Sequence, residues 1–387
     1  MYHLKAIIIG AGIGGLTTGI ALKRAGYEIE IYDRVRDLRP VGAGISLWSN
    51  GVKVMNWLGL GDEIQQMGGQ MNRMAYINNH NEVLNDIDLH PLVEKVGQRP
   101  YPVSRYELQY MLLEKVGKEH VHTGCKCVGV KEEGNQVTAI FEDGSTATGD
   151  VLIAADGVRS VLRDYVTQQK TEPRYAGYVN WNGIVEASPE LADKETWVIY
   201  VGEAKRASMM PIGSDRFYYF FGAPMEKGTV VEPSERRAEL AALFQGWPEP
   251  VQNLIQKLNP LETNRLEIHD LDPLENLARG RVALVGDAGH ATTPTLGQGG
   301  CQAMEDAEIL CRYLVTTNIS VPDALKRYET ARKERPAQLT LKARQRAGVI
   351  YGQQTDLTEQ WYESLKAEEE SDVTNAIAKI ILGGPFN

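Results

Sequence analysis

The sequence predicts an α/β fold, in which a Rossmann-like domain with a parallel sheet carries an inserted, mainly antiparallel β-sheet domain and is followed by C-terminal helices. Three observations support this prediction. A strand–glycine–helix pattern opens the chain, strand-like segments without long helices between them fill its middle, and a second strand–glycine pattern, RVALVGDAGHATTPTLGQGG, begins at residue 281. The parallel-sheet domain is therefore expected to be discontinuous in the sequence.

The N-terminal segment contains a complete nucleotide-binding pattern. An apolar, β-branched run (residues 4–9) leads into the glycine-rich sequence GAGIGG (10–15), and a helical pattern then leads to a second strand that ends at Asp33. Glycines at this spacing permit a tight turn and the close approach of a pyrophosphate, which the N-terminus of the following helix attracts. A carboxylate at the end of the second strand can accept hydrogen bonds from ribose hydroxyls. The residues expected to bind the dinucleotide here are Gly10, Gly12, Gly14, Gly15, Asp33 and Arg34.

The middle of the chain has the pattern of an antiparallel sheet. Its strand-like segments are YAGYVNWNGIVEA (175–187), TWVIYVG (196–202), RASMMPIG (206–213) and RFYYFFGAP (216–224), and residues 233–258 follow with a helical pattern. The C-terminal part is also helical, with Pro336 expected to break or kink its helix. We therefore assign 1–70, 101–172 and 270–345 to the nucleotide-binding domain, 71–100 and 173–269 to the sheet domain, and 346–387 to a C-terminal helical segment.

Composition excludes several classes of function. The formal net charge of −10 disfavours nucleic acid as a partner, because phosphate binding needs a concentrated positive surface. Four cysteines in 387 residues form no disulfide framework, and the scattered histidines predict no metal site. The apolar N-terminal stretch is interrupted by glycines and is not expected to be a signal peptide or a membrane span. We expect a cytoplasmic protein with a small-molecule substrate, and the sequence leaves its oligomeric state open.

Two later turns repeat the strand–turn arrangement of the N-terminus. The segment DVLIAADGVRSVLRDYV (150–166) places Asp156-Gly157 after an apolar strand, and the strand at 281–285 ends at Gly286-Asp287. The glycine loop after it can bring backbone N–H groups to a ligand. Expected binding residues in this loop are Gly297, Gln298, Gly299, Gly300 and Cys301. The buried face of the helix that follows is expected to consist of Cys301, Met304, Ala307, Leu310, Cys311 and Leu314.

Together and in this order, the three turns resemble those of the group A flavoprotein aromatic hydroxylases, which share the para-hydroxybenzoate hydroxylase fold. The resemblance spans nearly the whole chain and implies a tightly bound, non-covalent FAD. NADH or NADPH is then expected to act as a transient reductant. By the same likeness Arg105 reaches the pyrophosphate, Cys127 offers backbone atoms to the adenine, and Ser46 lies near the ribityl chain or the isoalloxazine. Asp156 and Asp287 belong to the same expected FAD site.

Within that family, the sequences RYAGYVNWNG, VGEAKRASMMP and RFYYFF (within 174–221) and residues 286–307 are similar to those of the bacterial FAD-dependent urate hydroxylases. The likeness implies hydroxylation of urate at C5 to 5-hydroxyisourate through a flavin C4a-hydroperoxide. It also implies catalytic roles for Arg206 and Tyr218. The expected substrate-binding residues are Asn180, Arg206, Tyr218, Tyr219 and Phe220.

Other interpretations remain open at this stage. The same flavin chemistry could act on another ring, such as salicylate or 6-hydroxynicotinate, and some proteins of this fold bind a partner without catalysis. Without the resemblance we would interpret Arg206 as a surface residue at a strand end. Residues 218–220 could simply alternate along a sheet, with one face in the core. For His290 a packing or hydrogen-bonding role is favoured over a catalytic one.

Overall fold

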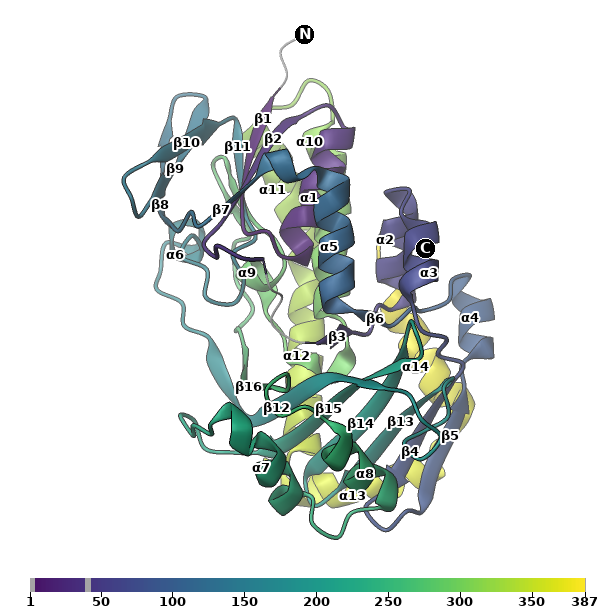
Figure 1. Ribbon diagram of the computed structural model, residues 1–387. Helices are drawn as coiled ribbons and strands as arrows, with labels where there is room; N and C mark the ends of the chain where they lie inside the picture. The colour runs from purple at the N-terminus through teal and green to yellow at the C-terminus, as the bar shows by residue number, and fades with distance from the viewer. Residues whose placement is uncertain (1–3, 39–42, 387) are drawn as a thin grey trace. The chain divides into compact units, whose positions relative to one another are not determined.

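The computed structural model describes residues 4–38 and 43–386, and the chain divides into two compact units (Figure 1). Unit 1 comprises Met1–Pro40, Glu107–Arg174 and His269–Ala343, and unit 2 comprises Val41–Tyr106, Tyr175–Ile268 and Arg344–Asn387. The parallel-sheet domain is thus discontinuous in sequence. The division differs from the boundaries expected above, because residues 41–70, 101–106 and 346–387 fall in unit 2 with the antiparallel sheet.

Unit 1 is built on a six-stranded sheet with the strand order β17-β18-β11-β1-β2-β7. All of its pairs are parallel except β17 with β18, and the central strands are almost fully buried, as in other parallel sheets. The strands are β1 (Lys5–Ile9), β2 (Glu28–Asp33), β7 (Val121–Thr123), β11 (Val151–Ala154), β17 (Ala278–Arg279) and β18 (Val282–Leu284). An antiparallel three-stranded sheet adds β8 (Cys127–Glu133), β9 (Gln136–Phe141) and β10 (Thr146–Gly149).

The helices of unit 1 include α1 and α10, which pack against each other. Their bounds are α1 (Ile13–Arg24), α5 (Arg105–Val116), α6 (Arg163–Thr167), α9 (Asp287–His290), α10 (Gly299–Leu314) and α11 (Val321–Arg332). The first two residues of α5 belong to unit 2, and helix α12 (Glu334–Ile350) begins in unit 1 and ends in unit 2. The helix break expected at Pro336 lies earlier, at Lys333. Pro336 falls in the first turn of α12, where a missing N–H costs little.

Unit 2 is built on a seven-stranded sheet with the order β16-β12-β15-β14-β13-β4-β5. Strands β12 to β15 are antiparallel neighbours, as predicted, whereas β13 pairs with β4 in parallel. The strands are β4 (Arg73–Asn78), β5 (Val83–Asp88), β12 (Arg174–Glu186), β13 (Thr196–Gly202), β14 (Lys205–Ile212), β15 (Arg216–Pro224) and β16 (Asn264–Asp270). A two-stranded ladder joins β3 (Gly44–Ile45) to β6 (Val103–Ser104).

One face of this sheet packs into a hydrophobic core with α7 and α8. That core contains Trp181, Met209, Phe221, Phe244 and Leu254, all nearly inaccessible to solvent. The opposite face carries polar and aromatic side chains, which the next section describes. The helices of unit 2 are α2 (Ser49–Trp57), α3 (Gly61–Met67), α4 (His90–Val96), α7 (Arg236–Leu243), α8 (Glu249–Lys257), α13 (Thr355–Ala367) and α14 (Glu370–Leu382).

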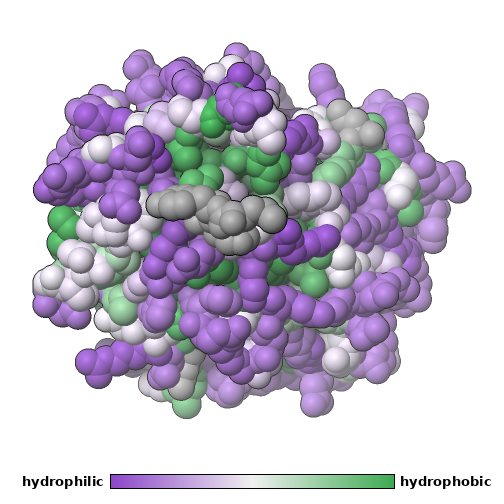
Figure 2. Space-filling model, turned by 90° about the horizontal axis from the view of Figure 1, so that it is seen from above, coloured by the Kyte–Doolittle hydropathy of each residue, from purple (hydrophilic) through white to green (hydrophobic). Residues whose placement is uncertain are grey.

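The surface of the described residues is mainly hydrophilic, as the 24% of charged residues in the sequence would suggest. On the face drawn in Figure 2 hydrophilic residues predominate, and apolar residues gather only in small patches. Within residues 4–38 and 43–386, no helix combines the length and the apolar character that a membrane span requires.

Candidate functional site

The predicted nucleotide-binding turns meet at one edge of the unit 1 sheet. Strands β18, β11, β1 and β2 are neighbours and run parallel. The first three are each followed at the carboxyl end by one of the turns, and β2 ends at Asp33. Backbone contacts join the turns directly, because Ala155 N–H donates to Ile9 O (2.7 Å) and Val285 N–H donates to Ala154 O (2.9 Å). The carboxyl edge of a parallel sheet is the usual place for ligands in such folds.

The glycines of the first turn have different physical roles. A Cβ on Gly10, whose φ is +109°, would lie 2.2 Å from Ala155 O, and a Cβ on Gly15 would lie 1.9 Å from Gly10 O. Both positions therefore require glycine for packing within the protein. Gly12, by contrast, begins α1 with open space where its Cβ would be. The first turn of α1 contains no acidic residue, so its free N–H groups and positive dipole end favour a phosphate there.

This contrast yields a prediction for two alanine variants. Gly12→Ala should leave the unfolding temperature within about 2 °C of the wild type but weaken FAD binding at least 10-fold, because only the ligand approaches this position. Gly15→Ala should destabilise the protein by about 2–4 kcal/mol, as expected for forced overpacking. Thermal unfolding of the apoprotein and FAD titration test the two effects separately. Equal destabilisation by both substitutions would contradict the assignment.

Asp33 first serves the glycine turn itself. Its Oδ2 accepts a hydrogen bond from Ala11 N–H (2.7 Å) and its Oδ1 accepts from Val35 N–H (3.0 Å). Each carboxylate oxygen can accept a second hydrogen bond, so Asp33 keeps acceptor capacity for a ribose hydroxyl. Gln109 supports the same turn by donating from Nε2 to Ala11 O (2.8 Å).

Asp156 has an unused acceptor at the same sheet edge. Its Oδ2 accepts from Val161 N–H (2.9 Å), while its buried Oδ1 has no hydrogen-bond partner among the described residues. Burial raises the pKa of this carboxyl. A buried acceptor without a partner costs free energy, and a ligand donor would remove that cost. Nearby, the buried Arg163 donates from Nε to Ala288 O (2.8 Å) and from Nη2 to Val158 O (2.7 Å), which joins the second turn to the third.

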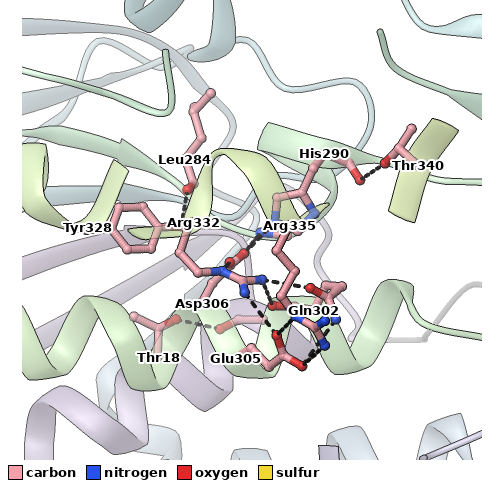
Figure 3. A network of polar contacts seen from close by, with 12 residues as sticks. Thr18, Leu284, His290, Gln302, Glu305, Asp306, Tyr328, Arg332, Arg335 and Thr340 are labelled. Carbon is pink, nitrogen blue, oxygen red and sulfur yellow. Dashed lines mark hydrogen bonds and ion pairs between the residues drawn. The ribbon is translucent and has the colours of Figure 1, made fainter. Parts of the chain in front are cut away.

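The third turn is held by a buried ionic network that joins α9, α10 and α11 (Figure 3). Asp306 Oδ2 accepts from Gly286 N–H (2.8 Å) and contacts His290 Nε2 (2.6 Å), while its Oδ1 accepts from Arg332 Nε (2.6 Å). Arg332 also donates to Glu305 Oε2 (2.9 Å). Burial alone would raise the pKa of Asp306, but adjacent His290 and Arg332 hold it well below its usual range. His290 thus has the hydrogen-bonding position that the sequence favoured.

Of the residues predicted to bind a ligand around the start of α10, Asp287 and the glycines are accessible to solvent, whereas Gln298 and Cys301 are not. Asp287 is exposed at the first position of α9, and Gly299 and Gly300 open α10, whose first turn contains no acidic residue. Gly297 has a φ of +64°, and Gln298 and Cys301 are buried. All six residues predicted for the buried face of α10 are buried, but the polar side of the helix is buried as well, since Glu305 and Asp306 are also inaccessible to solvent.

In unit 2, strand pairing decides which predicted substrate-binding residues share a face. On β15, Gly222 pairs with Asn180 of β12 on one side and Arg206 of β14 on the other, and Phe220 pairs with Asn182. Side chains alternate along a strand, so Tyr218 lies on the same face as these residues. We call this set the Arg206 cluster. Its members are Asn180, Asn182, Arg206, Tyr218 and Phe220.

Arg206 is a buried cation rather than a surface arginine. It is only 5% exposed, and its Nε has no hydrogen-bond partner among the described residues. Its guanidinium lies over the rings of Phe220 (4.9 Å to the centroid) and Trp197 (5.9 Å), which hold it by cation–π contacts. Trp197 is itself fixed, because its indole N–H donates to Ser208 Oγ (2.7 Å). A buried cation with a free donor is prepared for an anionic or oxygen-rich ligand.

Alternation along a strand exposes one side to solvent in the simplest case, but Asn180 and Asn182 are both buried, and Tyr218 and Tyr219 lie on opposite faces of the sheet. Asn180 and Asn182 are both buried on the cluster face, where Asn182 Nδ2 donates to Asn180 Oδ1 (2.8 Å), so neither faces solvent. Burial raises the pKa of Tyr218 to about 12, which keeps its phenol neutral. Tyr219 lies on the opposite face, in the hydrophobic core, with its hydroxyl 2.6 Å from Thr263 Oγ1. We therefore leave Tyr219 out of the proposed substrate site.

The other residues predicted to contact FAD are divided between the two units of the chain. Cys127 is buried at the start of β8, and its neighbour Cys125 is joined to Asp33 by a backbone hydrogen bond (2.8 Å). Arg34 is exposed. Ser46 and Arg105 belong to unit 2, at opposite ends of the β3–β6 ladder. No local pattern in the sequence predicts the Asp306–Arg332 pair, Trp197 or the role of Asn182.

Comparison with known proteins agrees with this geometry. A family model described as FAD binding domain matches residues 3–343. The FAD-dependent urate hydroxylase of Klebsiella pneumoniae subsp. pneumoniae is 47% identical over 384 residues (99% of this chain, 100% of that one), and its counterpart from Mycolicibacterium vanbaalenii is 44% identical over 386 residues (99% and 98%). The crystal structure of Klebsiella pneumoniae HpxO complexed with FAD and uric acid is similar with a TM-score of 0.96 at 46% identity, covering 99% of this chain and 98% of that one.

More distant structures share the fold. A salicylate hydroxylase substrate complex covers 98% of both chains with a TM-score of 0.78 at 23% identity. The glycine turns, the free Asp156 acceptor and the unblocked helix N-termini of unit 1 fit the dinucleotide that the family binds. The chain therefore belongs to the family defined by this FAD binding domain, and it is a flavin-dependent monooxygenase of the aromatic hydroxylase group with FAD as its cofactor.

Proposed function

We propose that this monooxygenase hydroxylates urate at C5 to give 5-hydroxyisourate, with O2 and with NADH or NADPH as reductant. The observation that carries the proposal is Arg206, a buried cation with a free Nε donor beside buried amides and aromatic rings. Full-length relatives at 44–47% identity are named urate hydroxylases, and one solved relative holds FAD and uric acid.

We assign FAD to the three turns described above and, on the family resemblance, to Ser46 and Arg105 as well. When bound and reduced, FAD supplies the electrophilic oxygen atom from O2. The glycine turns and the N-termini of α1 and α10 bind its phosphates and oxygen atoms through backbone N–H groups, while aspartates accept from its hydroxyl groups. The proposed residues are Gly10, Gly12, Gly14, Gly15, Asp33, Arg34, Ser46, Arg105, Cys127, Asp156, Asp287, Gly297, Gln298, Gly299, Gly300 and Cys301.

We assign the substrate to the Arg206 cluster. Urate is an anion near neutral pH, so the protein needs no base to activate it. Arg206 donates paired hydrogen bonds to urate oxygens and balances its charge. Asn180 both donates and accepts along the ring edge, and the neutral Tyr218 orients the ring by contact or hydrogen bonding. Phe220 holds the Arg206 guanidinium in place.

The proposal is tested with the FAD-loaded enzyme. Urate should accelerate NADH oxidation, and one molecule of urate should be consumed for each molecule of NADH. The product, 5-hydroxyisourate, is detected by its ultraviolet absorbance. Hydrogen peroxide is measured in the same reaction. If urate stimulates NADH oxidation but peroxide accounts for all the oxygen consumed, urate is an effector and another ring, such as salicylate or 6-hydroxynicotinate, is the substrate.

A further inference from the structure

Tyr351 lies beside the Arg206 cluster although it is far from the cluster in sequence. It directly follows α12 and lies outside residues 3–343, the part that the family model matches. Its ring stacks on that of Tyr178, with centroids 3.8 Å apart and an angle of 19° between the planes. Tyr178 is on β12, two residues before Asn180, and therefore on the cluster face of the sheet.

The hydroxyl of Tyr351 occupies the space above Gly222. A Cβ on Gly222 would lie 2.3 Å from Tyr351 Oη, so only glycine at this position admits the tyrosine. Gly222 is the residue that pairs with Asn180 on one side and Arg206 on the other. The hydroxyl therefore lies in the row between the two polar side chains that we assign to urate.

The charge state of Tyr351 suits a hydrogen-bond donor. Burial raises its pKa to about 12, and the nearby positive charge of Arg206 acts in the opposite direction. Tyr351 in turn adds to the raised pKa of Tyr218, so the three groups lie within electrostatic reach of one another. At neutral pH Tyr351 is therefore a phenol that can donate to an oxygen atom of a bound ring.

The segment after α12 is held to the sheet by two hydrogen bonds that follow Tyr351 in the chain. Gln353 donates from Nε2 to Ala176 O (2.6 Å) at the start of β12, and Ala204 N–H, in the turn between β13 and β14, donates to Tyr362 Oη (3.1 Å). Tyr178 and Tyr351 also belong to one buried cluster with Ile350. The Tyr351 hydroxyl is thus held in place before any ligand binds, which lowers the entropy cost of using it.

We propose that Tyr351 is a specificity-determining residue whose hydroxyl donates a hydrogen bond to one oxygen atom of the purine substrate. The inference rests on the proposed function, since it names a further contact of the same substrate. A site that hydrogen-bonds a particular oxygen discriminates strongly against analogues that lack it. Part of the substrate selectivity then comes from the C-terminal segment rather than from the FAD binding domain.

The test compares Tyr351→Phe with the wild type in ligand binding to the FAD-loaded, oxidised enzyme. Binding is followed by the change in flavin absorbance during titration with urate and with three analogues, each lacking one ring oxygen: xanthine (no 8-oxygen), 6,8-dioxopurine (no 2-oxygen) and 2,8-dioxopurine (no 6-oxygen). Tyr351→Phe should weaken urate binding about 10-fold or more, as expected for a lost bond to an anion. The analogue that lacks the contacted oxygen should bind both proteins equally.

Tyr200→Phe is the matched control, because Tyr200 is a buried tyrosine on the core face of the same sheet. It should bind all four ligands as the wild type does. If Tyr351→Phe binds urate with unchanged affinity, or loses all four ligands by the same factor, the inference fails. If the wild type itself does not bind urate, the proposed function fails instead, so the two failures are distinguishable.

Discussion

Asp306→Ala is expected to lower the free energy of unfolding by about 3–5 kcal/mol, because it removes a buried carboxylate that pairs with both Arg332 and His290. Asp306 and Arg332 are both fully buried and lie 2.6 Å apart (Oδ1 to Nε). The same carboxylate accepts the Gly286 N–H, so the third FAD turn should also loosen and FAD binding should weaken. Urea unfolding of the apoprotein measures the first effect and FAD titration the second.

A surface aspartate provides the control. Asp86 pairs with Arg73 across 2.6 Å, but both side chains are nearly half exposed. Asp86→Ala should therefore change the free energy of unfolding by no more than about 1 kcal/mol. If both variants lost a similar amount of unfolding free energy, the buried network would stabilise the protein no more than an exposed ion pair does.

The effect of Asp306 depends on pH in a defined direction. The folded state holds its pKa below the ordinary value, so its contribution to stability is fully present above the pKa of the unfolded chain, about 3.9. The contribution declines as the pH falls below that value, because the Asp306 carboxyl is then protonated in the unfolded state but still ionised in the folded state. The difference in unfolding free energy between the wild type and Asp306→Ala should be constant from pH 5 to 7 and should narrow at more acidic pH.

The sequence predicted the features that depend on local pattern. Glycines at 10, 12 and 15 predicted a turn between a strand and a helix, and the structure has β1, the turn and α1 in that order. The period of apolar residues after Cys301 correctly predicted that these residues are buried, but it did not predict that the polar side of α10 is buried as well. Such patterns are set by backbone geometry within a few residues, and tertiary contacts did not overrule them.

Features that depend on pairing across the chain could not be predicted in this way. Alternation along β15 shows that Tyr218 and Tyr219 face opposite sides, but only pairing with β14 decides which side holds Arg206. Tyr351 lies beside the cluster because Gly222, which is more than a hundred residues away in sequence, has no side chain to displace its hydroxyl. The Asp306–Arg332 contact joins two helices, and no local signal distinguishes these charges from those of a solvated helix face.

Arg206→Gln is expected to reduce kcat/KM for urate hydroxylation at least 100-fold while the bound FAD keeps its yellow absorbance. Removing one partner of a buried, charged hydrogen-bond pair costs about 2–5 kcal/mol, and glutamine supplies neither the charge nor the paired donors of arginine. Substrate that is poorly held should also divert oxygen to hydrogen peroxide. Urate loss, NADH oxidation and peroxide are measured in one assay. Loss of FAD from this variant would show that Arg206 is structural.

Two further variants separate the charge of Arg206 from its shape. Arg206→Lys keeps a positive charge but cannot place two parallel N–H groups on a planar ligand, so its kcat/KM should fall between those of the wild type and Arg206→Gln. Arg73→Gln removes an exposed arginine from β4 of the same sheet and should leave kcat/KM unchanged. If Arg206→Lys were as active as the wild type, a positive charge at this position would be sufficient for urate hydroxylation. The paired contact with the purine would then have no part in catalysis, and the free Nε of a buried guanidinium would need another explanation.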